Sequence, residues 1–182
     1  GKGAKQAFDP GATSPWKFDF YDEAKRIWHL LEEEGWPLPA DFNELAEQVG
    51  KLVGPMRTGA GAPVLCHNDF YGPNLLVTGD DICLIDWEYA AMGDYGCDFG
   101  NFIAQGSGYS VKRALEVLPY YFGREATDEE LLHCTACVAV VGWYWYVWAL
   151  FKECKGAPVG KWTRIWYDAA KDFSAAAQEM LD

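Results

Sequence analysis

The chain has 182 residues, half of them hydrophobic, and carries a formal charge of −12. A chain of this length and composition is expected to fold as one domain with a sizeable core, which excludes an intrinsically disordered protein. The negative charge argues against nucleic acid or an anionic membrane surface as a partner, and it suits a metal ion or a cationic small molecule.

Helical spacing of apolar residues dominates the chain on both sides of a short β-rich segment. Asp41 is a suitable N-cap for one helix, and Gly54 with Pro55 should end it. Thr127 and Glu130 have the spacing of a capping box at the start of another helix. In chain order, helices are predicted over 18–34, 41–53, 95–105, 110–122, 128–153 and 161–180.

The β-rich segment lies between the second and third predicted helices. "VLCHND" at 64–69 predicts a short strand that runs into a turn, and "NLLV" at 74–77 with "ICLID" at 82–86 predicts a hairpin around Gly79. The expected fold class is therefore mainly α with a small β-hairpin.

The run 134–151 carries no charge and contains "GWYWYVW" at 142–148. Its length is that of a short membrane span, but a span would place Trp and Tyr at its two ends rather than in its middle. We therefore expect a buried helix of a soluble protein and no membrane span.

Six cysteines are scattered along the chain, and no signal peptide opens it. This pattern predicts reduced thiols in a cytoplasmic protein. Cys134 and Cys137 form a C-x-x-C pair without a second pair of ligands, so we expect small core residues there rather than a zinc site.

The candidate catalytic and metal-binding residues are concentrated in one segment, "HNDFYGPNLLVTGDDICLIDWEYA" at 67–90. Phosphoryl transfer from ATP requires one carboxylate beside the attacking hydroxyl, and a second carboxylate with an amide oxygen to hold the metal ions on the phosphates. A hairpin brings its two ends together, so Asp69 and Asn74 can face Asp86 across it.

This segment resembles the catalytic loop and metal-binding Asp of the protein-kinase-like fold. "LIDWEYAAMGDYGCDFGNF" at 84–102 is similar to the choline/ethanolamine kinase family, within the group that includes aminoglycoside phosphotransferases. The resemblance implies Mg²⁺, with ATP as co-substrate. Its implied roles are a catalytic base at Asp69, metal ligands at Asn74 and Asp86, support of the catalytic loop by His67 and Asp98, and a contact to the metal or its surroundings by Glu88.

The same resemblance gives the aromatic run a function, because a quaternary ammonium is held by aromatic faces and negative charge. Trp145 and Trp148 resemble the family's choline-binding pair, and Trp162, Tyr167 and Tyr89 are expected to join them. Gln105 replaces an acid found in eukaryotic choline kinases, and Tyr71 replaces a Gln, which leaves the identity of the amine open. Packing roles are expected for Trp143, Tyr144, Tyr146 and Trp166.

The resemblance covers the C-terminal lobe of the family alone. No strand lysine or Gly-rich phosphate loop accompanies it, and "GKGAKQ" at the start lacks the required context. Residues 1–17 are expected to connect a missing N-terminal lobe to the kinase-like lobe over 18–182. The expected function is phosphorylation of choline or a similar amino alcohol by the longer protein, the fragment itself being inactive. Two alternatives are a kinase for another small alcohol, such as an aminoglycoside, and a non-catalytic module with an aromatic groove.

Overall fold

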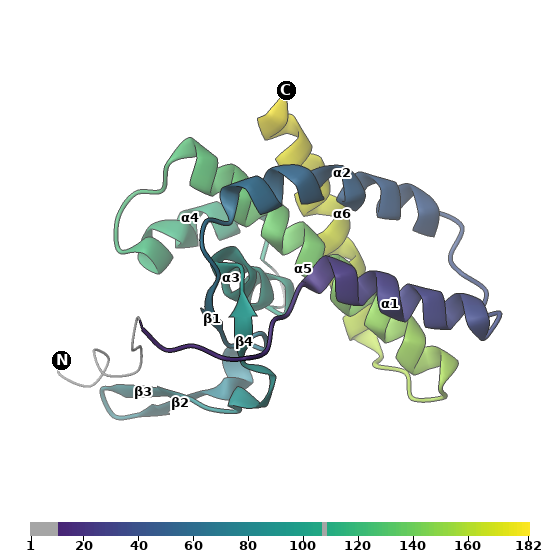
Figure 1. Cartoon of the computed structure of the whole chain (residues 1–182), viewed down its shortest axis with the longest axis horizontal. Helices are drawn as coiled ribbons and strands as arrows, with labels where there is room; N and C mark the ends of the chain where they lie inside the picture. The colour runs from purple at the N-terminus through teal and green to yellow at the C-terminus, as the bar shows by residue number, and fades with distance from the viewer. Residues whose placement is uncertain (1–10, 107–108) are drawn as a thin grey trace.

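The computed structural model of the chain describes residues 11–106 and 109–182 (Figure 1). The stretch "GKGAKQ" and residues 1–10 of the expected connector lie outside the described residues. The described part is mainly helical with two small antiparallel sheets, which confirms the expected fold class. Its elements are α1 (Phe20–Glu33), α2 (Phe42–Gly59), β1 (Val64–Cys66), the 3-10 turn η2 (Gly72–Asn74), β2 (Leu75–Thr78), β3 (Asp81–Leu84), the 3-10 turn η3 (Trp87–Tyr89), β4 (Ala91–Gly93), α3 (Tyr95–Ala104), α4 (Val111–Phe122), α5 (Asp128–Cys154) and α6 (Lys161–Leu181).

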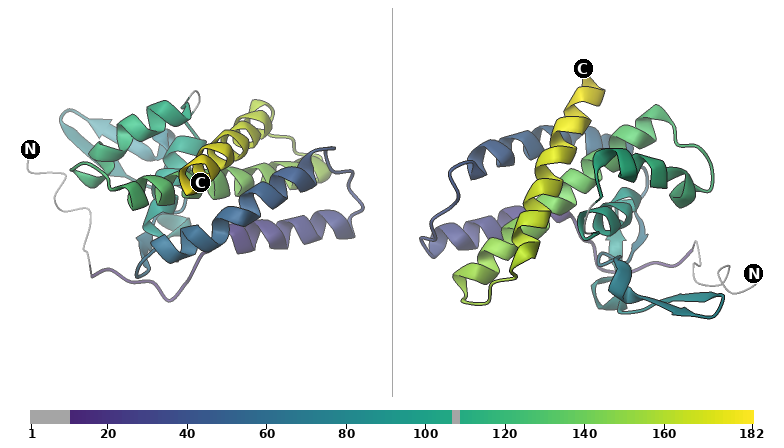
Figure 2. Two further views of the ribbon diagram at one scale, coloured as in Figure 1. Left: turned by 90° about the horizontal axis from the view of Figure 1, so that it is seen from above. Right: turned by 180° about the vertical axis from the view of Figure 1, so that it is seen from behind.

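Helix α5 is the centre of the molecule, and α1, α2, α3 and α6 all pack against it (Figures 1 and 2). It begins with the predicted capping box, in which Thr127 Oγ1 accepts from the Glu130 N–H and Glu130 Oε2 accepts from the Thr127 N–H. Among the described helices it alone is long and apolar enough to cross a membrane, yet 78% of its most apolar window is buried inside the molecule. The uncharged run is therefore a core helix, as predicted.

Helix α2 extends further than the sequence predicts. The prediction that Gly54 and Pro55 end this helix is wrong, because the helix continues to Gly59 with Pro55 inside it. Proline removes one N–H donor from the helix, while Met56 beyond it stays on the buried face. The free energy gained by burying that face is larger than the cost of the missing hydrogen bond. At the other end of α2, Asp41 occupies the N-cap position but makes no capping hydrogen bond with its side chain.

The two sheets bring together the segments that flank the polar motif. Strands β2 and β3 form the predicted hairpin, with Gly79 in the left-handed region at φ 61°, and Figure 1 shows it projecting from the helical body. Strand β4, which the sequence analysis missed, pairs antiparallel with β1 so that Cys66 lies opposite Ala91. The residues directly after β1 therefore lie beside those directly before β4.

Gly142 lies where α5 approaches the backbone of α6 closely, because a Cβ at this position would lie 2.8 Å from the backbone nitrogen of Ala170. We expect Gly142→Ala to lower the free energy of unfolding by about 1–3 kcal/mol, since backbone atoms cannot yield as a flexible side chain would. Gly50→Ala is a matched control in α2, where an added Cβ meets only the Tyr21 hydroxyl, at 3.2 Å, the end of a flexible side chain. It should leave stability unchanged or raise it by up to about 1 kcal/mol. Urea unfolding measures both, and equal stabilities for the two variants would contradict this account of the helix contact.

Candidate active site

Asp69 and Asn74 are in direct contact at the start of the hairpin. Asn74 Nδ2 donates to Asp69 Oδ2 at 3.1 Å and to the Asp69 carbonyl at 2.9 Å. The Asn74 carbonyl in turn accepts from the Ile85 N–H at 3.0 Å. The backbone of Asp86, the residue after Ile85, therefore lies across the hairpin from Asn74. Burial, followed by the negative charges of Asp69 and Asp86, raises the pKa of the Tyr71 hydroxyl.

The oxygens around Asn74 are suited to a divalent ion. Both amide hydrogens of Asn74 point to Asp69, so the amide oxygen is the end left to bind a cation. The Asp86 side chain is exposed, and Mg²⁺ prefers a few carboxylate or amide oxygens together with water and phosphate. These residues therefore fit the Mg²⁺ that the sequence motif implies.

Two backbone positions in this region are strained. Among the described residues other than glycine, Asn68 (φ 63°) and Asp86 (φ 67°) are the ones with positive φ. The left-handed conformation costs an L-residue roughly 1–2 kcal/mol, and Asn and Asp tolerate it best. The structure holds Asn68 by a 2.9 Å hydrogen bond from Nδ2 to the Tyr89 carbonyl. Such strain is characteristic of functional sites.

His67 and Asp98 hold the loop that carries Asp69. Asp98 Oδ2 accepts from the His67 N–H, and Oδ1 accepts from the Asn68 N–H, each at 2.8 Å. Burial raises the pKa of Asp98, although the two N–H donors favour its charged form. His67 Nε2 lies 2.8 Å from the Ile85 carbonyl, while Nδ1 accepts from the Asp69 N–H. These contacts tie the loop backbone to α3 and to the end of the hairpin, and they leave His67 no free ring nitrogen.

A cavity of about 420 Å³ adjoins this loop and extends to α5 and α6. Six residues that the sequence analysis singled out line it together: Asp69, Tyr89, Gln105, Trp145, Trp148 and Trp162. Phe18, Asn68, Tyr71, Tyr144, Val159 and Trp166 complete the lining.

One wall of the cavity is a stack of three indole rings. Trp166 lies in the middle, stacked on Trp145 at 5.4 Å and on Trp162 at 5.6 Å, with interplanar angles of 27° and 26°. Trp148 stands nearly perpendicular to Trp145, at 87°. Stacked and edge-on pairs of this kind fix the positions of the four indoles relative to one another.

The structure changes the assignment of three aromatic residues. Trp166 is buried, as expected of a packing residue, but it also lines the cavity, and Tyr144 lines it as well. Tyr167 does not reach the cavity: its hydroxyl donates to Asp41 on α2, and its ring packs against Tyr146. Consecutive residues on a helix point about 100° apart, so Trp166 and Tyr167 face different neighbours. The four-residue spacing from Trp162 to Trp166, about one helical turn, is the sequence signal by which Trp166 could have been chosen over Tyr167.

A chain of hydrogen bonds joins the aromatic wall to Asp69. Trp145 Nε1 donates to Asn101 Oδ1 at 2.8 Å, and Gln105 Nε2 lies 3.3 Å from the same oxygen. Gln105 Nε2 also donates to Asp69 Oδ1 at 3.0 Å. Asn101, which the sequence analysis did not select, is fully buried one helical turn before Gln105. Glu88 is exposed, and its charge adds to burial in raising the pKa of Tyr89.

The sequence comparisons assign the chain to a family. Residues 5–131, well over half of the chain, match the Phosphotransferase enzyme family, and the chain belongs to this family. It is also 25% identical over 175 residues to Protein LicA of Haemophilus influenzae, with 84% of this chain and 59% of that protein covered. The chain thus spans a little over half the length of this relative.

Solved structures of choline and ethanolamine kinases share the fold. A choline/ethanolamine kinase family protein from Mesorhizobium loti superposes with a TM-score of 0.72 at 23% identity, over 94% of this chain and 56% of that one. Choline kinase LicA from Streptococcus pneumoniae gives 0.72 at 21% identity, over 91% and 58%. A LicA complex with AMP gives 0.73 at 20% identity, over 92% and 57%.

Removing the Asp98 carboxylate should destabilise the loop. Asp98→Ala leaves the His67 and Asn68 N–H groups buried without an acceptor, and each such group costs roughly 1–3 kcal/mol. We expect the free energy of unfolding, measured with urea, to fall by about 2–5 kcal/mol, the range that two such groups span. Asp172→Ala on the exposed surface of α6 is the control and should cause no loss. A stability for Asp98→Ala equal to that of the control would show that the loop does not depend on this carboxylate.

Proposed function

We propose that this chain is the catalytic and substrate-binding lobe of an ATP-dependent kinase that phosphorylates choline or a similar amino alcohol. The observation that carries the proposal is the single cavity that joins the Asp69 carboxylate to a wall of tryptophans. Membership of the Phosphotransferase enzyme family supports the reaction class, and the names of the structural relatives favour an amino alcohol.

In the proposed reaction, Asp69 is the catalytic base. Gln105 donates to one of its carboxylate oxygens and Asn74 to the other, which orients the group toward a hydroxyl in the cavity. A base held in this way aligns the hydroxyl and accepts its proton as the phosphate is transferred. Asn74 and Asp86 would hold Mg²⁺, which supplies charge neutralisation on the phosphates of ATP.

The aromatic wall is proposed to bind the cationic head of the substrate. A trimethylammonium group has no hydrogen to donate, so it is recognised by ring faces and by negative charge. Trp145, Trp148, Trp162 and Tyr89 line the cavity, and Tyr144 and Trp166 join them in this proposal. Tyr167 is not included.

The remaining parts of the kinase are proposed to lie in a further lobe. The chain spans 56% to 59% of the relatives compared above, and a LicA structure holds AMP. Hairpin residues Val77 and Ile82 expose 70% and 61% of their surface, an apolar face that a nucleotide and a second lobe would cover. We propose residues 1–17 as the connector to that lobe, residues 18–182 as the kinase-like lobe, and the cytoplasm as the location of the whole protein.

The substrate ranking tests the proposal against a kinase for another alcohol. An aminoglycoside presents ammonium groups that donate hydrogen bonds, and these favour acidic clusters over indole faces. The longer protein that contains this chain should therefore release ADP faster with choline than with kanamycin. The reverse ranking would move the function to the alternative substrate class, and no ADP release with either would favour a non-catalytic binding module.

Asp69→Ala separates catalysis from binding. In the longer protein we expect the turnover number to fall by about 10²–10⁴-fold, the usual contribution of a general base. The dissociation constant of choline, measured by calorimetry, should change little, because the indole wall stays intact. Asp80→Ala in the hairpin turn serves as the control with unchanged turnover. Parallel loss of turnover and binding would mean that Asp69 holds the cation rather than the hydroxyl.

Trp145→Ala tests the cation site. Loss of one aromatic face should weaken choline binding by roughly 2–30-fold, which corresponds to a cation–π contact of about 0.5–2 kcal/mol. Binding of ethanolamine should weaken less, because its ammonium can still donate hydrogen bonds. Trp16→Ala, at a side chain that is 72% exposed and outside the cavity, is the matched control. An equal weakening of choline and ethanolamine binding would mean that Trp145 has only a packing role.

A further inference from the structure

A second group of potential ligands lies at the start of α3, apart from the residues proposed for Mg²⁺. Asp94 is the N-cap of α3, Cys97 lies in its first turn, and Cys137 faces them from α5. Their ligand atoms all lie within 4.8 Å of one another. Both thiols are buried, and Asp94 is largely covered.

His133 borders the same group from the preceding turn of α5. Its Nε2 lies 2.8 Å from Asp94 Oδ1 and 3.6 Å from Cys137 Sγ, and the ring is buried. His133 and Cys137 are four residues apart on one helix, a spacing that places both side chains on the same face. Imidazole, thiolate and carboxylate thus converge from two helices.

The distances from the Cys137 sulfur to His133 and Asp94 are close to those around a tetrahedral zinc ion, and the Cys97 sulfur lies within 4.8 Å of the Cys137 and Asp94 ligand atoms. Zinc bonds of about 2.0–2.3 Å place neighbouring ligand atoms roughly 3.3–3.8 Å apart. Cys137 Sγ lies 3.6 Å from His133 Nε2 and 3.9 Å from Asp94 Oδ2. The 2.8 Å contact between His133 and Asp94 would open by a few tenths of an ångström or more on binding the ion.

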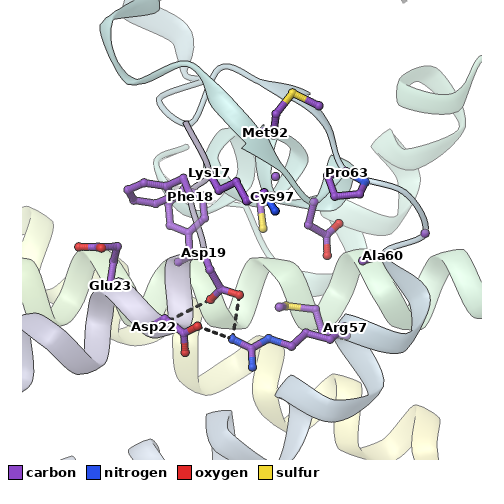
Figure 3. A pocket seen from close by; sticks show the side chains of 15 residues that line it. Lys17, Phe18, Asp19, Asp22, Glu23, Arg57, Ala60, Pro63, Met92 and Cys97 are labelled. Atoms are coloured by element: carbon purple, nitrogen blue, oxygen red, sulfur yellow. Dashed lines mark hydrogen bonds and ion pairs between the residues drawn. The ribbon is translucent and has the colours of Figure 1, made fainter. Parts of the chain in front are cut away.

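A cavity of about 410 Å³ gives an ion access to this group. Asp94 and Cys97 line it, and Figure 3 shows the Cys97 sulfur among the side chains that surround the cavity. Asp19, Asp22 and Glu23 also line it, together with Lys17 and Arg57. Arg57 is paired with Asp19 and Asp22. With Asp94, the lining carries four carboxylates against two cationic side chains, a net charge of −2 that favours a cation over an anion.

We propose that Asp94, Cys97 and Cys137, with His133 as fourth ligand, bind a divalent ion of the zinc class. Thiolate and imidazole ligands select zinc over magnesium. Four protein ligands would close the coordination sphere, which is the pattern of a structural site. The ion would tie α3 to α5 beside Asp98, the residue that holds the catalytic loop.

The site differs from the C-x-x-C pair in the sequence. Cys137 belongs to both, but its partners here are Cys97 and Asp94 from another helix rather than Cys134. Burial raises the pKa of the Cys137 thiol, so the ion must displace a proton from it. A disulfide between Cys97 and Cys137 is the competing chemistry, and a reductant in the test removes it.

The test is a cobalt titration of the full 182-residue chain, stripped with a chelator and kept in a phosphine reductant. One equivalent of Co²⁺ should produce thiolate-to-cobalt charge-transfer absorption together with the intense visible bands of tetrahedral cobalt. Zn²⁺ should abolish both signals and raise the melting temperature, because an ion that binds only the folded state stabilises it. Cys97→Ala and Cys137→Ala should each weaken Co²⁺ binding by at least about tenfold.

Two further variants serve as controls. Cys134→Ala, at a buried thiol on the same helix, and Cys83→Ala, at an exposed thiol, should retain the cobalt spectrum. Asp86→Ala should retain it too, because the Mg²⁺ ligands provide no thiolate. The absence of charge-transfer absorption in the unmodified chain would overturn the proposal, whatever the variants do. Loss of the signal in Cys134→Ala, with retention in Cys97→Ala, would overturn the ligand assignment. Neither result bears on the kinase proposal.

Discussion

The candidate active site depends on one buried carboxylate. Asp98 accepts hydrogen bonds from two consecutive N–H groups of the loop after β1, and this loop contains a residue in the left-handed conformation. Without an acceptor, two buried donors would have to find water or a different loop path. The position of Asp69 on the next residue follows from that anchorage, as does its contact with Asn74. A residue that touches no substrate thus determines where the proposed base lies.

Helix α3 combines the functions of this region on a single short element. Its N-terminal end carries Asp94 and Cys97, which face α5, and its middle carries Asp98, which holds the loop. Asn101 and Gln105 at its C-terminal end connect Trp145 to Asp69. The helix is almost entirely buried, so its polar side chains must be satisfied within the protein. This requirement explains why they form continuous networks rather than separate contacts.

The network through Asn101 and Gln105 has a consequence for the proposed reaction. The indole that would contact the cationic head shares hydrogen-bonded partners with the carboxylate that would contact the hydroxyl. The two ends of a bound amino alcohol would therefore be held by one connected frame. Positioning of this kind lowers the barrier by keeping reacting groups in alignment before the chemical step.

Local patterns in the sequence determined the helices, the hairpin and the convergence of Asp69 with Asn74. These features depend on residues near one another in the chain, where periodicity, capping and turn chemistry act directly. Only the tertiary structure decided that β4 pairs with β1 and that α2 continues through Pro55. It alone separated Trp166 from Tyr167 and joined Cys137 to Cys97. Each of these outcomes depends on which face a helix turns toward its neighbours, or on which distant strand another strand pairs with. Burial against other elements sets that choice, and neighbouring residues in the sequence do not encode it.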